Sequence, residues 1–292
     1  MESQRTILVC GATGRQGGAT VRHLLQGNWK VRALTRNIDS PSARQLKQLG
    51  AQVVPGDMEN SRSVEQAMNG CEGVFSVQNF WECGPDGEVR QGKQVADIAG
   101  QLDVDHFVYS SVGGANRSTG IPHFDSKWEI EQHIQRLGLP ATVIRPVFFY
   151  DNFNEEAIRS SILQGRLALP MEPTKPLQMV ATEDIGGLAA MAFERPREFI
   201  GKAIELAGDE MTMPDVAGVF TKVLGRPVRF DPVDLEEVER TSPESAIMFR
   251  WFNEQGYQAD LVSLRDMYPQ LQTFETWLRR TSYGQVPRTK VA

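Results

Sequence analysis

The chain has 292 residues, long enough to bury a sizeable core, and its 40% hydrophobic and 23% charged residues are ordinary for a globular protein. Its formal net charge of −6 disfavours a primary role in nucleic-acid binding, and no apolar run approaches the roughly 18 residues of a membrane span. The N-terminal residues lack the apolar core of a secretion signal, and three scattered cysteines are too few for a disulfide framework or a zinc site. We therefore expect a reducing, cytoplasmic setting and no metal site.

Short β-branched runs alternate with helical stripes through the first half of the chain. Strands are expected over residues 6–10, 29–34, 51–54, 73–77, 106–110 and 141–145. Helices are expected from residue 19 onward and over 42–49, 63–68, 88–102 and 124–137. This alternation is typical of an α/β fold with a Rossmann-type doubly wound parallel sheet, whose ligands bind at the carboxyl ends of the strands.

After about residue 150 the alternation loosens, and prolines interrupt a loop-like stretch over 170–176. A strand is expected over 202–206, and helices over 185–193 (with Thr182 as N-cap), over 213–224, and within 243–256 and 273–280. We assign residues 1–150 to a dinucleotide-binding Rossmann domain and residues 151–292 to a smaller mixed C-terminal lobe, partly interleaved with the first. The apolar residues of this lobe are more typical of helix packing than of a pocket, so the sequence names no substrate.

A glycine-rich turn between the first strand and the first helix is the strongest functional motif. Gly11, Gly14 and Gly17 follow the strand at GxxGxxG spacing. Glycine allows a tight turn and a close approach to phosphates, and the N–H groups of the following helix point at such an anion. Because a strand precedes the turn and a helix follows it, the motif predicts a dinucleotide site in preference to a turn without a ligand.

The end of the second strand indicates which dinucleotide is preferred. An NAD site usually has a carboxylate there, whereas this strand ends in Thr35, Arg36 and Asn37. A guanidinium can hold a 2′-phosphate through forked hydrogen bonds, and Arg15 adds positive charge beside Gly14. We therefore expect NADP(H) to be preferred over NAD(H), with a solvated surface arginine as the alternative interpretation of Arg36.

Polar residues also follow the third and fourth strands. Asp57 could accept hydrogen bonds from an adenine amino group, with Met58 against the ring, or it could equally bond its own turn. Gln78, Asn79 and Phe80 lie where the nicotinamide half of a cofactor would pass. These three could line the cleft or could equally serve as loop packing.

The segment after the fifth strand bears on catalysis. Extended-type dehydrogenases have a Tyr-x-x-x-Lys pair here, in which tyrosine moves a proton and lysine holds the nicotinamide ribose. The lysine is present as Lys127, but the tyrosine position is His123. We expect Lys127 to bind cofactor, whereas a catalytic role for His123 is the less favoured of its two interpretations. Ser110 and Ser111 end the fifth strand, where they are either substrate-polarising or ordinary loop hydroxyls.

Taken together, these motifs resemble those of the NmrA-like family, atypical members of the short-chain dehydrogenase/reductase superfamily. The resemblance rests on residues 11–17, 35–37, 56–57, 78–82, 92–93, 123–127, 149–152 and 180–186, and so covers most of the chain. It implies an NADP(H) site that includes Gly11, Ala12, Thr13, Gly14, Arg15, Gln16, Gly17, Arg36, Asn37, Asp57, Met58, Gln78, Asn79, Phe80, Arg90, Lys127, Phe149, Tyr150, Asp151 and Asn152. Arg90 is aligned less securely than the others, because the loop before it is one residue shorter.

Relatives of this kind divide into two functional groups. Where the tyrosine is missing, the family resemblance implies a regulator that senses cofactor redox state and transmits it to a protein partner, with little turnover. Other branches are active reductases that depend on the lysine alone, so an NAD(P)H-dependent reductase of a small carbonyl, quinone or enone is the alternative. A third interpretation is a scaffold whose nucleotide cleft stays empty. Neither direct nucleic-acid binding nor membrane binding is expected, and an oligomer is possible.

Overall fold

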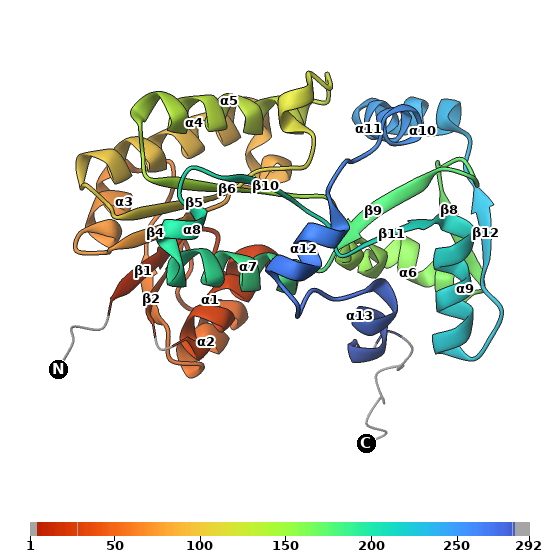
Figure 1. The fold of residues 1–292 in the computed structure, drawn as a ribbon, viewed down its shortest axis with the longest axis horizontal. Helices are drawn as coiled ribbons and strands as arrows, with labels where there is room; N and C mark the ends of the chain where they lie inside the picture. The colour runs from red at the N-terminus through yellow and green to blue at the C-terminus, as the bar shows by residue number, and fades with distance from the viewer. Residues whose placement is uncertain (1–4, 28, 282, 284–292) are drawn as a thin grey trace. The chain divides into compact units, whose positions relative to one another are not determined.

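The computed structural model describes residues 5–27, 29–281 and 283, and its chain divides into two compact units (Figure 1). The first unit comprises Met1–Pro146 and Thr182–Leu206, and the second comprises Val147–Ala181 and Ala207–Ala292. The sequence assigned all of residues 151–292 to the smaller lobe, whereas the structure returns Thr182–Leu206 to the first unit. Interleaving of the two units is therefore more extensive than a single boundary at residue 150 implies.

A seven-stranded sheet forms the centre of the first unit, with the strand order β10-β6-β5-β4-β1-β2-β3. Every neighbouring pair in it is parallel. The strands are β1 (Thr6–Val9), β2 (Lys30–Thr35), β3 (Gln52–Pro55), β4 (Gly73–Ser76), β5 (His106–Ser110), β6 (Ala141–Pro146) and β10 (Ala203–Leu206). From β1 the sheet grows towards β2 and β3 on one side and then towards β4, β5 and β6 on the other, so the strand order reverses between β1 and β4. Doubly wound sheets bind dinucleotides at such a switch point. The predicted fold class is confirmed.

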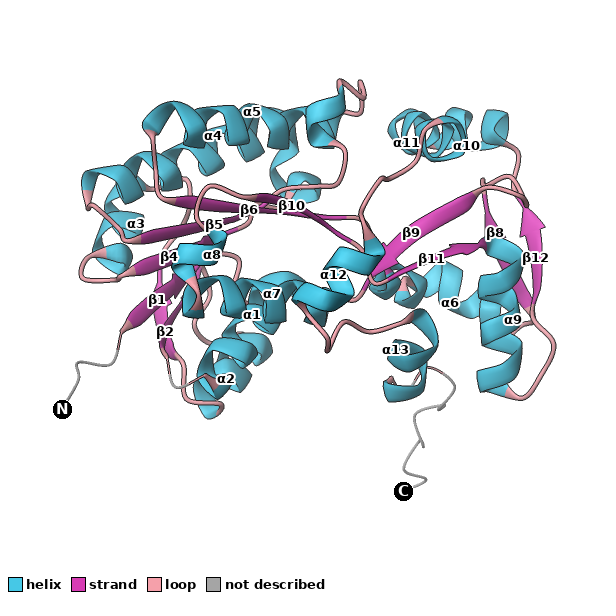
Figure 2. Ribbon diagram, in the orientation of Figure 1, coloured by secondary structure: helices cyan, strands magenta, loops and turns pink. Residues whose placement is uncertain are grey.

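Helices cover both faces of this sheet (Figure 2). One face carries α3 (Ser61–Met68), α4 (Phe80–Gln101) and α5 (Pro122–Leu137); the other carries α1 (Arg15–Gln26), α2 (Pro41–Gln48), α7 (Thr182–Glu194) and α8 (Pro196–Phe199). Alternating strand side chains point to opposite faces, so Leu8, Val74 and Phe107 pack with α4 residues such as Val95 in one buried cluster. This packing fixes the carboxyl ends of the strands, where the predicted site lies.

The two helices α1 and α7 approach closely because a glycine stands at their crossing. A Cβ at Gly186 of α7 would lie 2.5 Å from the backbone carbon of Ala19 in α1. The helix expected over 185–193 is present as α7, which begins about one turn earlier, at Thr182. Thr182 is the first residue of this helix rather than its N-cap.

The second unit is a mixed α/β lobe, as predicted. Its strands form two small sheets, of order β11-β9-β7 and β12-β8. The strands are β7 (Phe148–Phe149), β8 (Arg166–Leu169), β9 (Pro176–Val180), β11 (Asp209–Thr212) and β12 (Arg229–Pro232). The helices are η2 (Tyr150–Asn154), α6 (Glu156–Leu163), α9 (Met213–Leu224), α10 (Leu235–Thr241), α11 (Pro243–Glu254), α12 (Leu261–Met267) and α13 (Phe274–Arg280), while a short η1 (Ala115–Arg117) lies in the first unit.

Aromatic rings form much of the core of the second unit. Phe153, Phe220 and Phe274 contact one another with ring centroids 5.3–5.6 Å apart. The predicted preference for core packing in this lobe is consistent with these contacts. In the described part of the chain, none of the helices combines the length and the apolar character that crossing a bilayer requires.

Candidate nucleotide-binding site

The glycine turn after β1 has the backbone conformation that its sequence predicts. Gly11 has a φ of +64°, a conformation that L side chains rarely adopt, and the Gly14 N–H donates to the Gly11 carbonyl at 2.9 Å. A Cβ at Gly17 would lie 2.2 Å from that same carbonyl oxygen, so a side chain there would push the turn away from the helix. The first turn of α1 contains no acidic side chain, which leaves its N-terminal N–H groups available to an anion.

A second contact ties the end of the glycine turn to β5, the next strand but one from β1. Gln16, at the start of α1, accepts a hydrogen bond from Ser110 at the end of β5, with 2.5 Å between the two oxygens. Ser110 is fully buried. The structure therefore uses this hydroxyl to position the glycine turn, which favours the structural interpretation of Ser110 over a substrate-polarising one.

Arg36 and Asn37 lie at the end of β2, where the sequence predicted them. Arg36 donates to the Glu82 carboxylate near the start of α4, with 2.6 Å between Nη2 and Oε2. The hydrogen bond that the guanidinium donates to Glu82, and then the negative charge of Glu82, raise the pKa of Arg36. Asn37 is exposed, and its side-chain oxygen accepts from the Asp39 N–H. Arg36 is thus neither buried nor simply solvated, because a carboxylate holds it.

Asp57 takes one of the two roles that the sequence left open, that of a turn aspartate, and its contact with adenine stays a prediction. One carboxylate oxygen accepts from the Glu59 N–H at 3.0 Å, as expected of a turn aspartate. Met58 is partly buried against the core and receives a weak hydrogen bond from Gln78 at 3.7 Å. Arg90 forms a two-pronged ion pair with Glu59, at 2.9 and 3.0 Å, and is exposed. The loop after β3 and the middle of α4 are joined by this pair.

Gln78 has a hydrogen-bonding capacity that the protein leaves unused. Its amide nitrogen donates to Ser76 at 2.9 Å, but its Oε1 is buried and without a hydrogen-bond partner among the described residues. A buried acceptor of this kind is costly unless it is satisfied, and a ligand N–H or O–H would satisfy it. The close approach of Gly17 to the Gly11 carbonyl and this unpaired Gln78 oxygen both fit a nucleotide bound along the carboxyl ends of β1 and β4.

Lys127 is held by a buried carboxylate that the sequence analysis did not anticipate. Its Nζ lies 2.8 Å from Oε1 of Glu88, and Ser126 donates to the other oxygen at 2.5 Å. The Glu88 side chain has no exposed surface, whereas 12% of the Lys127 side chain is exposed. The ammonium therefore reaches the surface while its counter-charge lies between α4 and α5.

His123 belongs to an aromatic cluster at the start of α5. Its ring centroid lies 5.5 Å from those of Phe80 and Trp81 and 4.9 Å from that of Phe124. Phe80 is buried, whereas 69% of Trp81 is exposed. These contacts fix the imidazole by packing beside the first turn of α4, and its place on the nicotinamide side of the site stays a prediction.

Ser111 is part of a separate buried network. It donates to Glu131 at 2.5 Å, and Arg145 forms a two-pronged ion pair with the same carboxylate at 3.0 and 2.6 Å. Glu131 lies on α5 and is almost completely buried. This network joins β5, β6 and α5, which again favours the structural interpretation of the serine.

Residues 149–152 lie in the second unit. The Tyr150 side chain is fully buried, packs on Phe274 and Trp277, and donates to the Gln272 carbonyl at 3.3 Å. Its packing makes it a core residue of that unit. Its neighbours Phe149, Asp151 and Asn152 are partly exposed, so the predicted contact with cofactor stays a prediction for these three.

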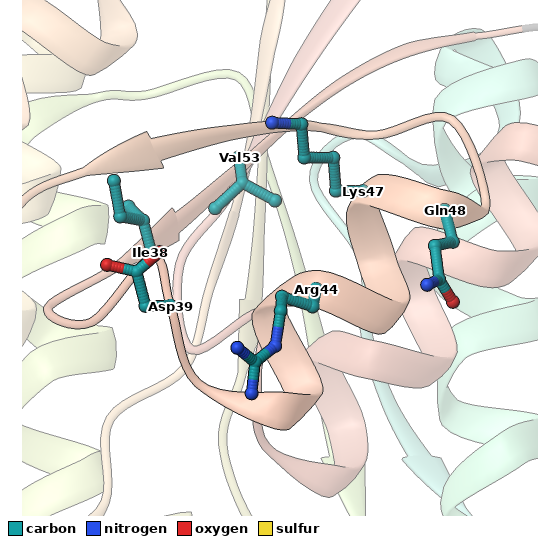
Figure 3. A pocket seen from close by; sticks show the side chains of 6 residues that line it. All are labelled: Ile38, Asp39, Arg44, Lys47, Gln48 and Val53. Atoms are coloured by element: carbon teal, nitrogen blue, oxygen red, sulfur yellow. The ribbon is translucent and has the colours of Figure 1, made fainter.

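A hollow of about 500 Å³ lies beside α2 and the edge strand β3 (Figure 3). Its lining residues are Ile38, Asp39, Arg44, Lys47, Gln48 and Val53. It adjoins the loop that carries Arg36 and Asn37, but it includes none of the predicted cofactor contacts.

In the described part of the chain, no group of three or more His, Cys, Asp or Glu side chains is placed to hold a metal ion.

Sequence reasoning missed Glu88, although a signal for it was present. Glu88 shares one face of α4 with Gly92, Val95 and Ala99, all of which are buried. An acidic residue on the apolar stripe of a helix requires a buried partner, because an unpaired charge in a core is strongly unfavourable. The same signal marks Glu131 on α5.

Comparison with known proteins identifies the family. The model of the NmrA-like family matches residues 3–278. The chain belongs to the NmrA-like family. An NmrA-like family domain-containing protein of Dictyostelium discoideum is 31% identical over 96% of this chain and 98% of its own. An NAD(P)H azoreductase of Xenophilus azovorans is 29% identical over 80% of this chain and 79% of its own.

Solved structures agree with the fold of this NmrA-like protein. NmrA, described as a negative transcriptional regulator, matches with a TM-score of 0.81 in its complex with NADP and 0.82 in its complex with NAD. In both comparisons the identity is 20%, and 96% of each chain is covered. At this identity the likeness establishes the Rossmann-type architecture, and it leaves the role of the individual residues to the geometry described above.

Proposed function

We propose that this NmrA-like protein binds NADP(H) in preference to NAD(H) and acts as a redox sensor or regulator with little intrinsic turnover. The glycine turn and the N-terminus of α1 would hold the pyrophosphate, and Arg36 the 2′-phosphate. Asp57 and Met58 would contact the adenine, Gln78 and Phe80 the nicotinamide side. When bound, a reduced nicotinamide supplies a hydride; Lys127 would donate hydrogen bonds to the ribose beside it.

The single observation that carries the regulatory role is the environment of Lys127. No tyrosine stands four residues before it, and its ammonium is committed to the buried Glu88 carboxylate at 2.8 Å. His123, at the tyrosine position, is packed between aromatic rings. This arrangement suits the fixed orientation of a bound cofactor better than repeated proton transfer to a substrate.

The decisive experiment is a calorimetric titration with NADPH and NADH, followed by a turnover screen on the same preparation. We expect tight NADPH binding, weaker NADH binding, and no steady oxidation of NADPH with quinones, enones or azo dyes. Failure of both cofactors to bind would contradict the proposal and favour the scaffold interpretation. A regulatory role further requires a protein partner whose binding differs between the NADPH-loaded and NADP⁺-loaded protein, which pull-down with each form measures.

A reductase is the second candidate, and the sequence relationship to an NAD(P)H azoreductase supports it. In that case Lys127, through a bound water or with His123, would assist proton transfer after hydride delivery. Steady NADPH consumption that disappears in Lys127→Met, while NADPH binding survives, would establish it and displace the sensor. The reducing, cytoplasmic setting expected from the few, scattered cysteines of the sequence remains part of this proposal.

A further inference from the structure

Glu82 pairs with Arg36, the residue proposed to bind the 2′-phosphate, and this pairing bears on the choice between NADP and NAD. Arg36 and Glu82 are 66% and 55% exposed and lie 2.6 Å apart. An exposed pair of this kind is held weakly, so a stronger anion can displace the carboxylate. A 2′-phosphate carries more charge than a carboxylate and offers several acceptor oxygens to the same guanidinium.

Glu82 also lies on a separate piece of helix. The segment Phe80–Cys83 forms the first turn of α4, and the helix is broken directly after it, where Gly84 has a φ of +68° and Pro85 follows. At its other end, the Asn79 side chain caps the turn by accepting from the Trp81 N–H. One turn of helix is therefore bounded by a cap and a kink, and the Arg36 ion pair ties it to the end of β2.

The same turn carries Phe80 and Trp81, which follow β4, where the nicotinamide would lie in the proposed site. Phe80 and Trp81 both contact the His123 ring, and most of the Trp81 side chain is exposed. A change in the partner of Glu82 at the adenosine end of the site would act directly on these rings. The turn Phe80–Cys83 thus connects the two ends of a dinucleotide.

We propose that Glu82 is a specificity-determining residue that competes with the cofactor 2′-phosphate for Arg36, and that this exchange releases the turn Phe80–Cys83. The inference rests on the proposed function, because it assumes that a dinucleotide occupies this site. NAD lacks the 2′-phosphate, so it leaves the Arg36–Glu82 pair intact, and its 2′-hydroxyl can donate to the carboxylate. The protein would then report NADP and NAD differently.

The first test compares affinities for the oxidised cofactors NADP⁺ and NAD⁺ by calorimetry. Glu82→Gln removes the competing charge at an exposed position, so we expect about a fivefold gain in NADP⁺ affinity and an unchanged or lower NAD⁺ affinity. The matched control is Glu72→Gln, which removes a partly exposed glutamate paired with Arg5 just before the amino ends of β4 and β1 and should change neither. Equal gains for both cofactors, or no gain for NADP⁺, would overturn the specificity role.

The second test follows Trp81 fluorescence with two fragments that lack nicotinamide. Adenosine 2′,5′-bisphosphate carries the 2′-phosphate and adenosine 5′-monophosphate does not, so any difference between them arises at Arg36. We expect only the bisphosphate to change the emission of the wild-type protein, and we expect no such change in Trp81→Phe. In Glu82→Gln the emission should already be close to that of the bisphosphate-bound wild type before any ligand is added. Identical responses to both fragments would refute release of the turn. If the wild-type protein binds neither dinucleotide, the proposed function itself fails and this inference falls with it.

Discussion

Replacing Glu88 by glutamine tests whether the buried ion pair fixes Lys127. Glutamine keeps the size of the side chain and can still bond Ser126, but it leaves the Lys127 ammonium without its counter-charge. Glu88 has no exposed surface, and only 12% of the Lys127 side chain reaches solvent. Removing one partner of such a pair costs about 3–5 kcal/mol, because the remaining charge is buried alone.

The partial exposure of Lys127 sets the expected magnitude. Some hydration of the ammonium can be recovered at the surface, so we expect the lower end of that range, about 3 kcal/mol of unfolding free energy. For a chain of this size such a loss lowers the melting temperature by roughly 6–12 °C. The exposed pair between Lys93 and Glu129 joins the same two helices and provides a matched control. Glu129→Gln should change stability by less than about 1 kcal/mol.

The assay is urea unfolding of the wild type, Glu88→Gln and Glu129→Gln, together with a double-mutant cycle of Glu88→Leu, Lys127→Met and the double variant. If the two side chains form a buried pair, the double variant is more stable than the sum of the single losses predicts, by about 2 kcal/mol. Strictly additive losses, or a Glu88→Gln protein as stable as Glu129→Gln, would refute the argument. Either result would also remove the structural basis for the proposed restraint on Lys127.

Three further predictions concern the cofactor site and the sheet. Arg36→Glu should weaken NADPH binding about tenfold or more while NADH binding changes little, as measured by calorimetry; equal losses would defeat the assignment. Gly17→Ala should weaken both cofactors, because its Cβ would meet the Gly11 carbonyl at 2.2 Å, whereas Gly18→Ala, whose nearest such contact is 3.4 Å, should bind nearly as well as wild type. Burial lowers the pKa of His106 to about 4, so the folded state resists protonation and stability falls by about 3 kcal/mol between pH 6.5 and 4. Unfolding of His106→Gln measured across that range should show a flatter profile, and an unchanged slope would contradict it.

The elements of the first unit could be predicted because each is encoded locally. The strand over 29–34 lies between two segments with helical periodicity, so the change of period marks its ends. The GxxGxxG spacing predicts a nucleotide-binding turn because it directly follows the first strand. The sequence predicted the strand near residue 203, but it did not predict that this strand belongs to the large parallel sheet. It pairs with β6 through residues about 60 positions earlier in the chain, and local periodicity carries no information about such a partner.

The side chains that pair with the predicted site residues could not be predicted from the sequence for the same reason. Arg36 and Glu82 are 46 residues apart, and Lys127 and Glu88 are 39 apart. Their contacts depend on how α4 lies against β2 and α5, which follows from the packing of the whole sheet. The sequence singled out these cations as candidate cofactor contacts, whereas it could not predict that carboxylates already hold them.

The exposure of those carboxylates separates two kinds of cation in this site. Arg36 and Arg90 are paired with exposed glutamates, and such pairs exchange for a phosphate at little free-energy cost. Lys127 is paired with a buried one, which it cannot leave without stranding a charge in the core. In the proposed site, cofactor binding at the two arginines would therefore be an exchange of partners, whereas at Lys127 it would be an addition to a pair that stays formed. This difference favours a site in which the adenosine end responds to the ligand while the nicotinamide ribose meets a fixed donor.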